Sequence, residues 1–181
     1  MPNTPEAVYL FYAMSKIGAI ANMVDPRTSA EGLKNYIEEV GSDLVIIVDS
    51  YYNKVKDLRK IGNVKQIVAI SPSESLPFGL NLGYKAKEFI EGLKNSEKKI
   101  VLEDGTINWS QFIENGKEYK LNTEAEFKNN RPLVIEHTGG TTGIPKGVVL
   151  SNENINAVAL QSVLTGIDMQ REHNWMDIMP T

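Results

Sequence analysis

The chain of 181 residues contains no cysteine and only two histidines, His137 and His173. Without cysteine, the protein has no disulfide, no thiolate metal site and no cysteine nucleophile. The histidines are far apart in the sequence and form no metal-binding motif, so we expect each to be structural or solvent-facing, and we expect no metal site. The absence of thiols also fits a reducing compartment, and we predict a cytoplasmic protein.

Long apolar runs and a strong excess of one charge are also missing. No apolar stretch approaches the length of a membrane span, and no signal peptide is recognisable. Lysine and arginine number 19 against 23 acidic residues, a net charge of −4, which argues against a general nucleic-acid surface. With 41% hydrophobic residues, the composition is that of an ordinary globular domain.

Helical patterns alternate with short apolar runs along the first 70 residues. Thr4 and Ser29 are typical helix N-caps, and Gly18 and Gly41 are suited to end those two helices. Continuous apolar runs follow at residues 44–48 and 66–70, as in strands that are buried in a parallel sheet. This alternation predicts an α/β fold with a mostly parallel sheet flanked by helices and right-handed crossovers.

Some elements of this pattern carry more specific expectations. The first helix has apolar residues all round, which predicts that it is buried. Tyr52, Val55 and Leu58 share one face of a further helix, and residues 71–84 lose the pattern to proline, glycine and serine. Later come a short helix capped by Asn108, strands near residues 133–136 and 148–150, and a long helix capped by Ser151.

The most informative segment lies between the last two apolar runs. It reads Thr138-Gly139-Gly140-Thr141-Thr142-Gly143-Ile144-Pro145-Lys146-Gly147. Its glycines let the backbone approach a ligand closely, its amides can form an anion nest, and its threonines and lysine supply donors. Such a composition favours phosphate binding, although a surface loop that binds nothing is the simpler alternative.

The order of these residues excludes the two commonest phosphate loops. A Walker A motif needs lysine after its last glycine and opens a helix, whereas here Lys146 precedes Gly147 and β-branched residues follow. A Rossmann G-x-G-x-x-G fingerprint is absent as well.

The segment from Thr138 to Gly147 resembles, without a gap, the signature of the acyl-adenylate-forming superfamily, which includes acyl-CoA ligases and peptide-synthetase adenylation domains. Gly139 is familiar there among fatty acyl-CoA ligases, while His137 stands where a tyrosine is common. Residues 3–19 and 22–27 also resemble an early helix and loop of that family. The resemblance identifies residues 1–181 as part of the large N-terminal AMP-binding domain. Relative to the family, we expect that the first strands and the small C-terminal domain are missing.

The resemblance implies an enzyme that activates a carboxylic acid with ATP, releases pyrophosphate and transfers the acyl group to coenzyme A, usually with Mg²⁺. It implies that Thr138, Thr141 and Thr142 donate to the phosphates, that Gly139, Gly140 and Gly143 permit close approach, and that Lys146 offsets phosphate charge or holds the loop in shape. It points to a fatty or other apolar acid as the substrate. The family's adenine and ribose motifs are not found, so we expect the 181-residue chain by itself to be inactive.

Three alternatives remain open at this level. The chain could belong to an adenylation domain that loads a carrier protein. It could be a non-catalytic module that binds a nucleotide or an anion, or an α/β scaffold whose loop binds nothing. The sequence does not identify the acid or the oligomeric state.

Overall fold

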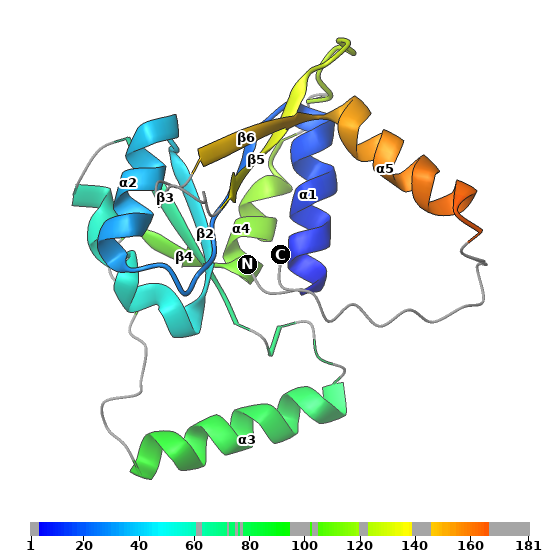
Figure 1. Cartoon of the computed structure of the whole chain (residues 1–181). Coiled ribbons are helices and arrows are strands. Elements are labelled where there is room, and N and C mark those ends of the chain that lie inside the picture. The colour runs from blue at the N-terminus through cyan, green and yellow to red at the C-terminus, as the bar shows by residue number, and fades with distance from the viewer. Residues whose placement is uncertain are drawn as a thin grey trace.

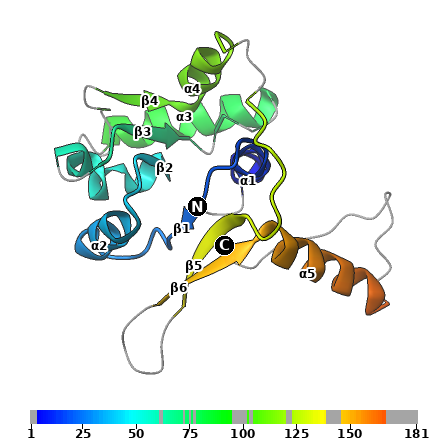
Figure 2. The same cartoon turned by 90° about the horizontal axis from the view of Figure 1, so that it is seen from above.

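The protein was analysed as a computed structural model, which describes residues 4–60, 63–71, 73–74, 76, 78–94, 102, 105–119, 123–138 and 146–166. Two three-stranded sheets with helices around them make up the described fold (Figures 1 and 2). The helices are α1 (Pro5–Ile17), α2 (Ala30–Val40), η1 (Asp49–Lys54), η2 (Lys56–Lys60), α3 (Phe78–Lys94), α4 (Trp109–Gly116) and α5 (Asn152–Leu164). The strands are β1 (Ala21–Met23), β2 (Leu44–Val48), β3 (Gln66–Ile70), β4 (Thr106–Asn108), β5 (Pro132–Thr138) and β6 (Lys146–Ser151).

One sheet has the strand order β2-β3-β4 and is parallel throughout. The other has the order β1-β5-β6, in which β1 and β5 are parallel and β6 runs antiparallel to β5. Three of the four strand pairings are parallel and one is antiparallel, and helices flank both sheets, which is the arrangement of an α/β fold. The predicted α/β fold with mostly parallel strands is confirmed.

The helix ends follow the predicted capping residues. Thr4, Ser29, Asn108 and Ser151 each accept a backbone N–H of the first helical turn. Gly18 and Gly41 follow α1 and α2 in the left-handed conformation, with φ of 73° and 68°. Because that conformation is strained for residues with a Cβ, glycine at these two positions ends each helix where the sequence predicts.

The main core lies between β2, β3 and the helices after β1 and β2. It contains the buried residues Leu33, Ile37, Ile47, Tyr52, Val55, Leu58, Val64 and Ile67. The helix predicted through Tyr52 and Leu58 is present as the two 3₁₀ segments η1 and η2 instead of one α-helix. Tyr52, Val55 and Leu58 follow one another at intervals of three residues, and this spacing places them on one face of a 3₁₀-helix, which has three residues per turn.

Three other expectations were wrong in detail. Helix α1 is not buried: Tyr9 and Tyr12 are exposed, and only Glu6 and Leu10 are buried. Strand β2 is exposed at Leu44, because β2 is at the edge of its sheet. Part of the segment predicted to be irregular belongs to α3, which lies apart from the two sheets in Figure 1.

Within the part of the chain that the structure describes, no helix is both long and apolar enough to cross a membrane.

Candidate phosphate-loop site

Strands β5 and β6 pair antiparallel, and the glycine- and threonine-rich segment is the connection between them in the sequence. Thr138 pairs with Lys146 in the strand register, and the Thr138 hydroxyl donates to the Lys146 carbonyl over 3.4 Å. The hairpin therefore brings together the first and last predicted phosphate contacts. Gly139, Gly140, Thr141, Thr142 and Gly143 lie outside the described residues, so their predicted roles stay predictions.

The hairpin is positioned by the parallel pairing of β5 with β1. Ala21 pairs with Val134 and Met23 with Glu136, so both strands end at the same edge of the sheet. The carboxyl ends of parallel strands are where α/β proteins commonly bind their ligands. The segment that follows β1 thus lies beside the root of the candidate loop.

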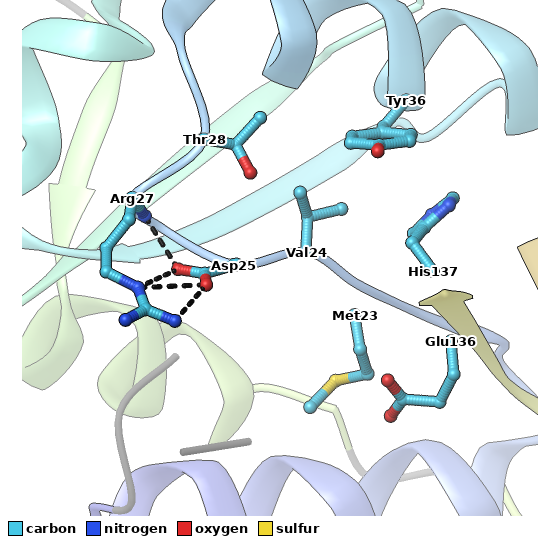
Figure 3. Close-up of a pocket in the computed structure, with 8 residues that line it drawn as sticks. All are labelled: Met23, Val24, Asp25, Arg27, Thr28, Tyr36, Glu136 and His137. Atoms are coloured by element: carbon cyan, nitrogen blue, oxygen red, sulfur yellow. Dashed lines mark hydrogen bonds and ion pairs between the residues drawn. The ribbon is translucent and has the colours of Figure 1, made fainter. Parts of the chain in front are cut away.

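A cavity of about 220 Å³ occupies this edge (Figure 3). It is lined by Met23, Val24, Asp25, Arg27, Thr28, Tyr36, Glu136 and His137. The lining combines the last residue of β1, residues that follow it, one residue of α2 and two residues near the end of β5, and it includes both acidic and basic side chains. Since a water molecule takes up roughly 30 Å³, the cavity can hold a small polar group with its water.

Much of the charge in this cavity is balanced locally. The backbone N–H of Arg27 donates to Asp25 over 2.8 Å, and its guanidinium binds both carboxylate oxygens, the shortest contact being 2.6 Å (Figure 3). These hydrogen bonds hold the pKa of Asp25 at about 2. Asp25 is therefore ionised at neutral pH, and the positive charge of Arg27 is directed at it rather than into the cavity.

His137 connects the root of the hairpin to β1 and α2. Its Nε2 lies 2.7 Å from Asn22 Oδ1, and the Asn22 amide donates to the Tyr36 carbonyl over 3.1 Å and to Ser42 Oγ over 3.3 Å. Because those two acceptors orient the amide, its oxygen faces the imidazole and Nε2 carries the donated proton. The Tyr36 ring packs against the His137 ring at a tilt of 39°, with 4.1 Å between the ring centroids.

These contacts agree with the structural role predicted for His137. Its other nitrogen, Nδ1, is buried and has no hydrogen-bond partner among the described residues. The close approach of Gly147 explains part of that burial, since a Cβ there would lie 3.7 Å from Nδ1. The second histidine, His173, lies outside the described residues.

Glu136 is the second acidic residue of the cavity. Unlike Asp25, it forms no ion pair with Arg27. Partial desolvation raises the pKa of its carboxyl above the ordinary value, and the nearby His137 acts in the opposite direction. Glu136, Asn22 and Tyr36 were not predicted as parts of the site. Only the rule that ligands gather at the carboxyl ends of parallel strands could have indicated Glu136 from the sequence.

Lys146 is exposed at the start of β6 and has no ion pair with any residue that the structure describes. The described residues also contain no group of three or more histidine and acidic side chains that could hold a metal ion. What the described geometry brings together at the root of the loop is Thr138 and Lys146, whose hydroxyl and ammonium groups can each donate a hydrogen bond to an anion.

Comparison with known families gives a match along the whole chain: the model of the family described as AMP-binding enzyme covers residues 1–181. A long-chain-fatty-acid–CoA ligase of Bacillus subtilis is 29% identical over 160 residues, which are 87% of this chain and 27% of the relative. A 3-hydroxypropionyl-coenzyme A synthetase of Sulfurisphaera tokodaii is 32% identical over 151 residues, 83% of this chain and 21% of the relative. The chain thus spans about a quarter of the length of these relatives.

Solved structures show the same fold. The anthranilate CoA ligase AuaEII in complex with anthranoyl-AMP superimposes with a TM-score of 0.63 at 16% identity, covering 93% of this chain and 26% of the other. A long-chain-fatty-acid-CoA ligase from Archaeoglobus fulgidus gives a TM-score of 0.60 at 22% identity, covering 92% of this chain and 27% of the other.

Proposed function

The chain belongs to the AMP-binding enzyme family, and from this premise we propose that it is part of an AMP-forming carboxylate–CoA ligase. The observation that carries the proposal is the unbroken motif from Thr138 to Gly147, in which Thr138 pairs with Lys146 on the β5–β6 hairpin. We propose that residues 1–181 supply part of the N-terminal domain, and that the remaining site residues come from outside this chain.

The proposed reaction has two steps. A carboxylate oxygen of the acid attacks the α-phosphorus of ATP, the bond to pyrophosphate breaks, and acyl-AMP forms. The thiol of coenzyme A, after losing its proton, then attacks the acyl carbonyl, and AMP leaves. The names of the relatives support coenzyme A as the acceptor, and the Bacillus relative supports a fatty acid as one substrate.

In the first step, the loop holds the departing pyrophosphate. The hydroxyls of Thr138, Thr141 and Thr142 donate to phosphate oxygens, and Gly139, Gly140 and Gly143 allow the backbone to come close. Lys146 offsets the charge that grows on the leaving group or holds the loop in shape. Among the described residues there is no group of three or more histidine and acidic side chains that could hold a metal ion, and we propose that Mg²⁺ arrives with ATP.

The test is ATP–pyrophosphate exchange, with a fatty acid as substrate, in a longer protein that contains this chain. Lys146→Ala and Thr141→Ala are expected to lower the exchange rate about 100-fold, the scale of losing one positioned donor to a charged transition state. Lys117→Ala is the matched control, since Lys117 is an exposed lysine directly after α4 that pairs with Glu114. Unchanged exchange in both loop variants would rule out the phosphate role.

The chain of 181 residues should by itself bind ATP weakly and form no acyl-adenylate. Calorimetry with ATP and a product assay on the purified chain check both points. Acyl-adenylate formation by the chain alone would contradict the proposed inactivity while supporting the reaction. Binding of ATP without any reaction in the longer protein would instead favour the non-catalytic nucleotide-binding module. Acyl transfer to a carrier protein in place of coenzyme A would favour the adenylation domain.

A further inference from the structure

His137 lies on β5 directly before Thr138, the first of the two proposed phosphate contacts that the structure describes. In the strand register His137 lies opposite Gly147, and Thr138 lies opposite Lys146. His137 therefore belongs to the last cross-strand pair before the pair that the proposed reaction uses. Contacts that hold its side chain also limit how far Thr138 and Lys146 can shift.

Gly147 is part of the Thr138–Gly147 motif, but the proposed phosphate binding gives it no role. The structure shows a close contact at this position. A Cβ on residue 147 would lie 3.5 Å from His137 Cε1 and 3.1 Å from Ile135 Cγ2. A branched side chain would extend further, into the space that the imidazole occupies. Glycine at this position thus lets the His137 ring pack against the backbone of β6.

Two residues from much earlier in the chain hold the same ring. Tyr36 of α2 packs against it with 4.1 Å between the ring centroids, and Figure 3 shows the two side chains next to each other. Asn22 of β1 places its Oδ1 2.7 Å from Nε2 of His137. The hydrogen bond fixes one edge of the imidazole, and the Tyr36 ring restricts its rotation.

The Asn22 side chain is itself held in one orientation. Its amide nitrogen donates to the Tyr36 carbonyl over 3.1 Å and to Ser42 Oγ over 3.3 Å. An amide group offers two N–H donors, and these two acceptors use both of them. The amide oxygen is therefore left to face His137, and the contacts continue from α2 through Asn22 to the end of β5.

This side-chain contact continues the attachment of β5 to β1 beyond the point where backbone pairing stops. The pairing of β1 with β5 ends at Met23 and Glu136, so among the described strands the last two residues of β5 pair with β6 alone. Asn22 lies opposite Ile135. His137 is two residues further along β5, and residues two apart share one face of a strand. The Asn22 side chain can therefore reach diagonally across to His137.

We propose that Asn22 and His137 are positioning residues, which hold Thr138 and Lys146 in place for the phosphates of ATP. The inference rests on the proposed function, because it assigns a partner to the same phosphate contacts. Neither positioning residue touches a substrate in this proposal. Without their hydrogen bond, the end of the β5–β6 pair has to be ordered when ATP binds, and the entropy of that ordering weakens the binding of ATP.

The test is the KM for ATP in the ATP–pyrophosphate exchange assay, with the longer protein that contains this chain. His137→Phe keeps a ring beside Tyr36 but has no donor for Asn22, whereas His137→Gln keeps an N–H donor. We expect His137→Phe to raise the KM for ATP about tenfold, and His137→Gln to raise it by less than about threefold, on the scale of one hydrogen bond. The KM for the fatty acid should stay unchanged in both variants. A loss of stability alone would lower the apparent kcat through the amount of folded enzyme and leave both KM values unchanged.

Two further variants sharpen the measurement. Ser15→Ala is the matched control, because Ser15 donates to Asn152 Oδ1 over 3.0 Å, and Asn152 follows β6 at the end away from Lys146. This variant also removes a hydrogen bond between distant segments, but we expect no change in the KM for ATP. Asn22→Ala removes the acceptor for His137 and should act like His137→Phe, so it tests the contact even where the phenylalanine variant does not fold. The double variant should raise the KM no further than either single change.

The outcomes separate this inference from the proposed function. If Lys146→Ala lowers exchange while Asn22→Ala and His137→Phe leave the KM for ATP unchanged, the positioning role is overturned and the phosphate role stands. Unchanged exchange in Lys146→Ala would refute the phosphate role and the positioning role together. An equal rise in the KM for ATP in Ser15→Ala, or fully additive effects of the Asn22 and His137 changes, would also overturn the positioning role.

Discussion

The two sheets of this protein differ in what their side chains do. In the β2-β3-β4 sheet, four of the five residues of β3 are buried, and the main hydrophobic core surrounds them. In the β1-β5-β6 sheet, the first four residues of β6 are exposed, and the sheet carries the polar cavity and the candidate loop. The buried core and the candidate ligand site therefore lie on different sheets. Side chains that must stay accessible to a ligand cannot at the same time be buried in the core.

The sharpest way to test this separation is to remove apolar volume from each sheet. Ile67 of β3 is fully buried at 0% exposure, so Ile67→Ala should lower the free energy of unfolding by about 2–5 kcal/mol. Val149→Ala on β6 removes an exposed side chain and should cost no more than about 0.5 kcal/mol. Urea denaturation of both variants gives the two free energies of unfolding. Equal losses in the two variants would contradict the conclusion that the β2-β3-β4 sheet carries the main core.

A second test uses two glycines of the same conformation, one beside each sheet. Gly18→Ala forces a left-handed alanine whose Cβ would lie 2.8 Å from Ala125 Cβ, and we expect a loss of about 2–4 kcal/mol. Gly41→Ala has the same conformational strain, but its nearest contact, Asn63 Nδ2, is at 3.5 Å, so about 1–2 kcal/mol should be lost. The difference in unfolding free energy between the variants measures the steric contact alone. A larger loss of stability in Gly41→Ala than in Gly18→Ala would contradict the expected steric effect of Ala125.

Polar contacts hold the β1–β5 side together, and Asn22 is central to them. Asn22→Ala leaves the Nε2 donor of His137 and the two former acceptors of the amide without their partner, so we expect a loss of about 1–3 kcal/mol. Ser42→Ala removes only the 3.3 Å contact and should cost less than about 1 kcal/mol. Chemical denaturation compares the two, and NMR of the His137 ring would report its release. A ring signal unaffected by Asn22→Ala would contradict the proposed anchoring.

The smallest expected effects concern pH and have opposite signs at two carboxyls of one cavity. The pKa of Asp25 is lowered to about 2, so its stabilisation is present above about pH 4 and is lost as the pH falls toward 2. The pKa of Glu136 is raised by desolvation, so it lowers stability as the pH rises through and above its ordinary value. Both groups are exposed enough that each effect should stay below about 1 kcal/mol.

Unfolding free energies of Asp25→Asn and Glu136→Gln between pH 2 and 7 check the two signs. The difference between the original chain and Asp25→Asn should shrink as the pH falls from 4 to 2. Glu136→Gln should gain stability relative to the original chain as the pH rises above about 4.5. If the unfolding free energies of both variants changed in the same direction with pH, the predicted opposite pKa shifts of Asp25 and Glu136 would be wrong.

Local features of the fold could be predicted from the sequence because they depend on neighbouring residues. Thr4 and Ser151 mark helix starts through contacts three residues away, and Gly18 marks an end through its own φ. Helix α3 was missed because Gly79 and Gly83 lower helix propensity, and no Cβ contact within 4 Å requires either glycine. The three-residue strand β4 was too short to give a periodic signal.

The candidate site was predictable only where one segment carries it. The Thr138–Gly147 motif is continuous, so its residue types and order were informative without a structure. The cavity beside it is made by the pairing of β1 with β5, which brings Asp25 and Arg27 close to Glu136. No local pattern encodes that pairing, and this is why Glu136 and Asn22 were not identified beforehand.

The distance along the chain between pairing partners has a consequence for the order of folding. The contact of His137 with Asn22 spans 115 residues, whereas that of Lys65 with Asp43, beside the β2–β3 pair, spans 22. Because closing a longer loop costs more entropy, the β2–β3 unit should form early and the β1–β5 pairing late. Pulse-labelling during refolding would show protection at β3 before β5. During synthesis on a ribosome, the cavity beside the loop would then be assembled last, on a unit that is already folded.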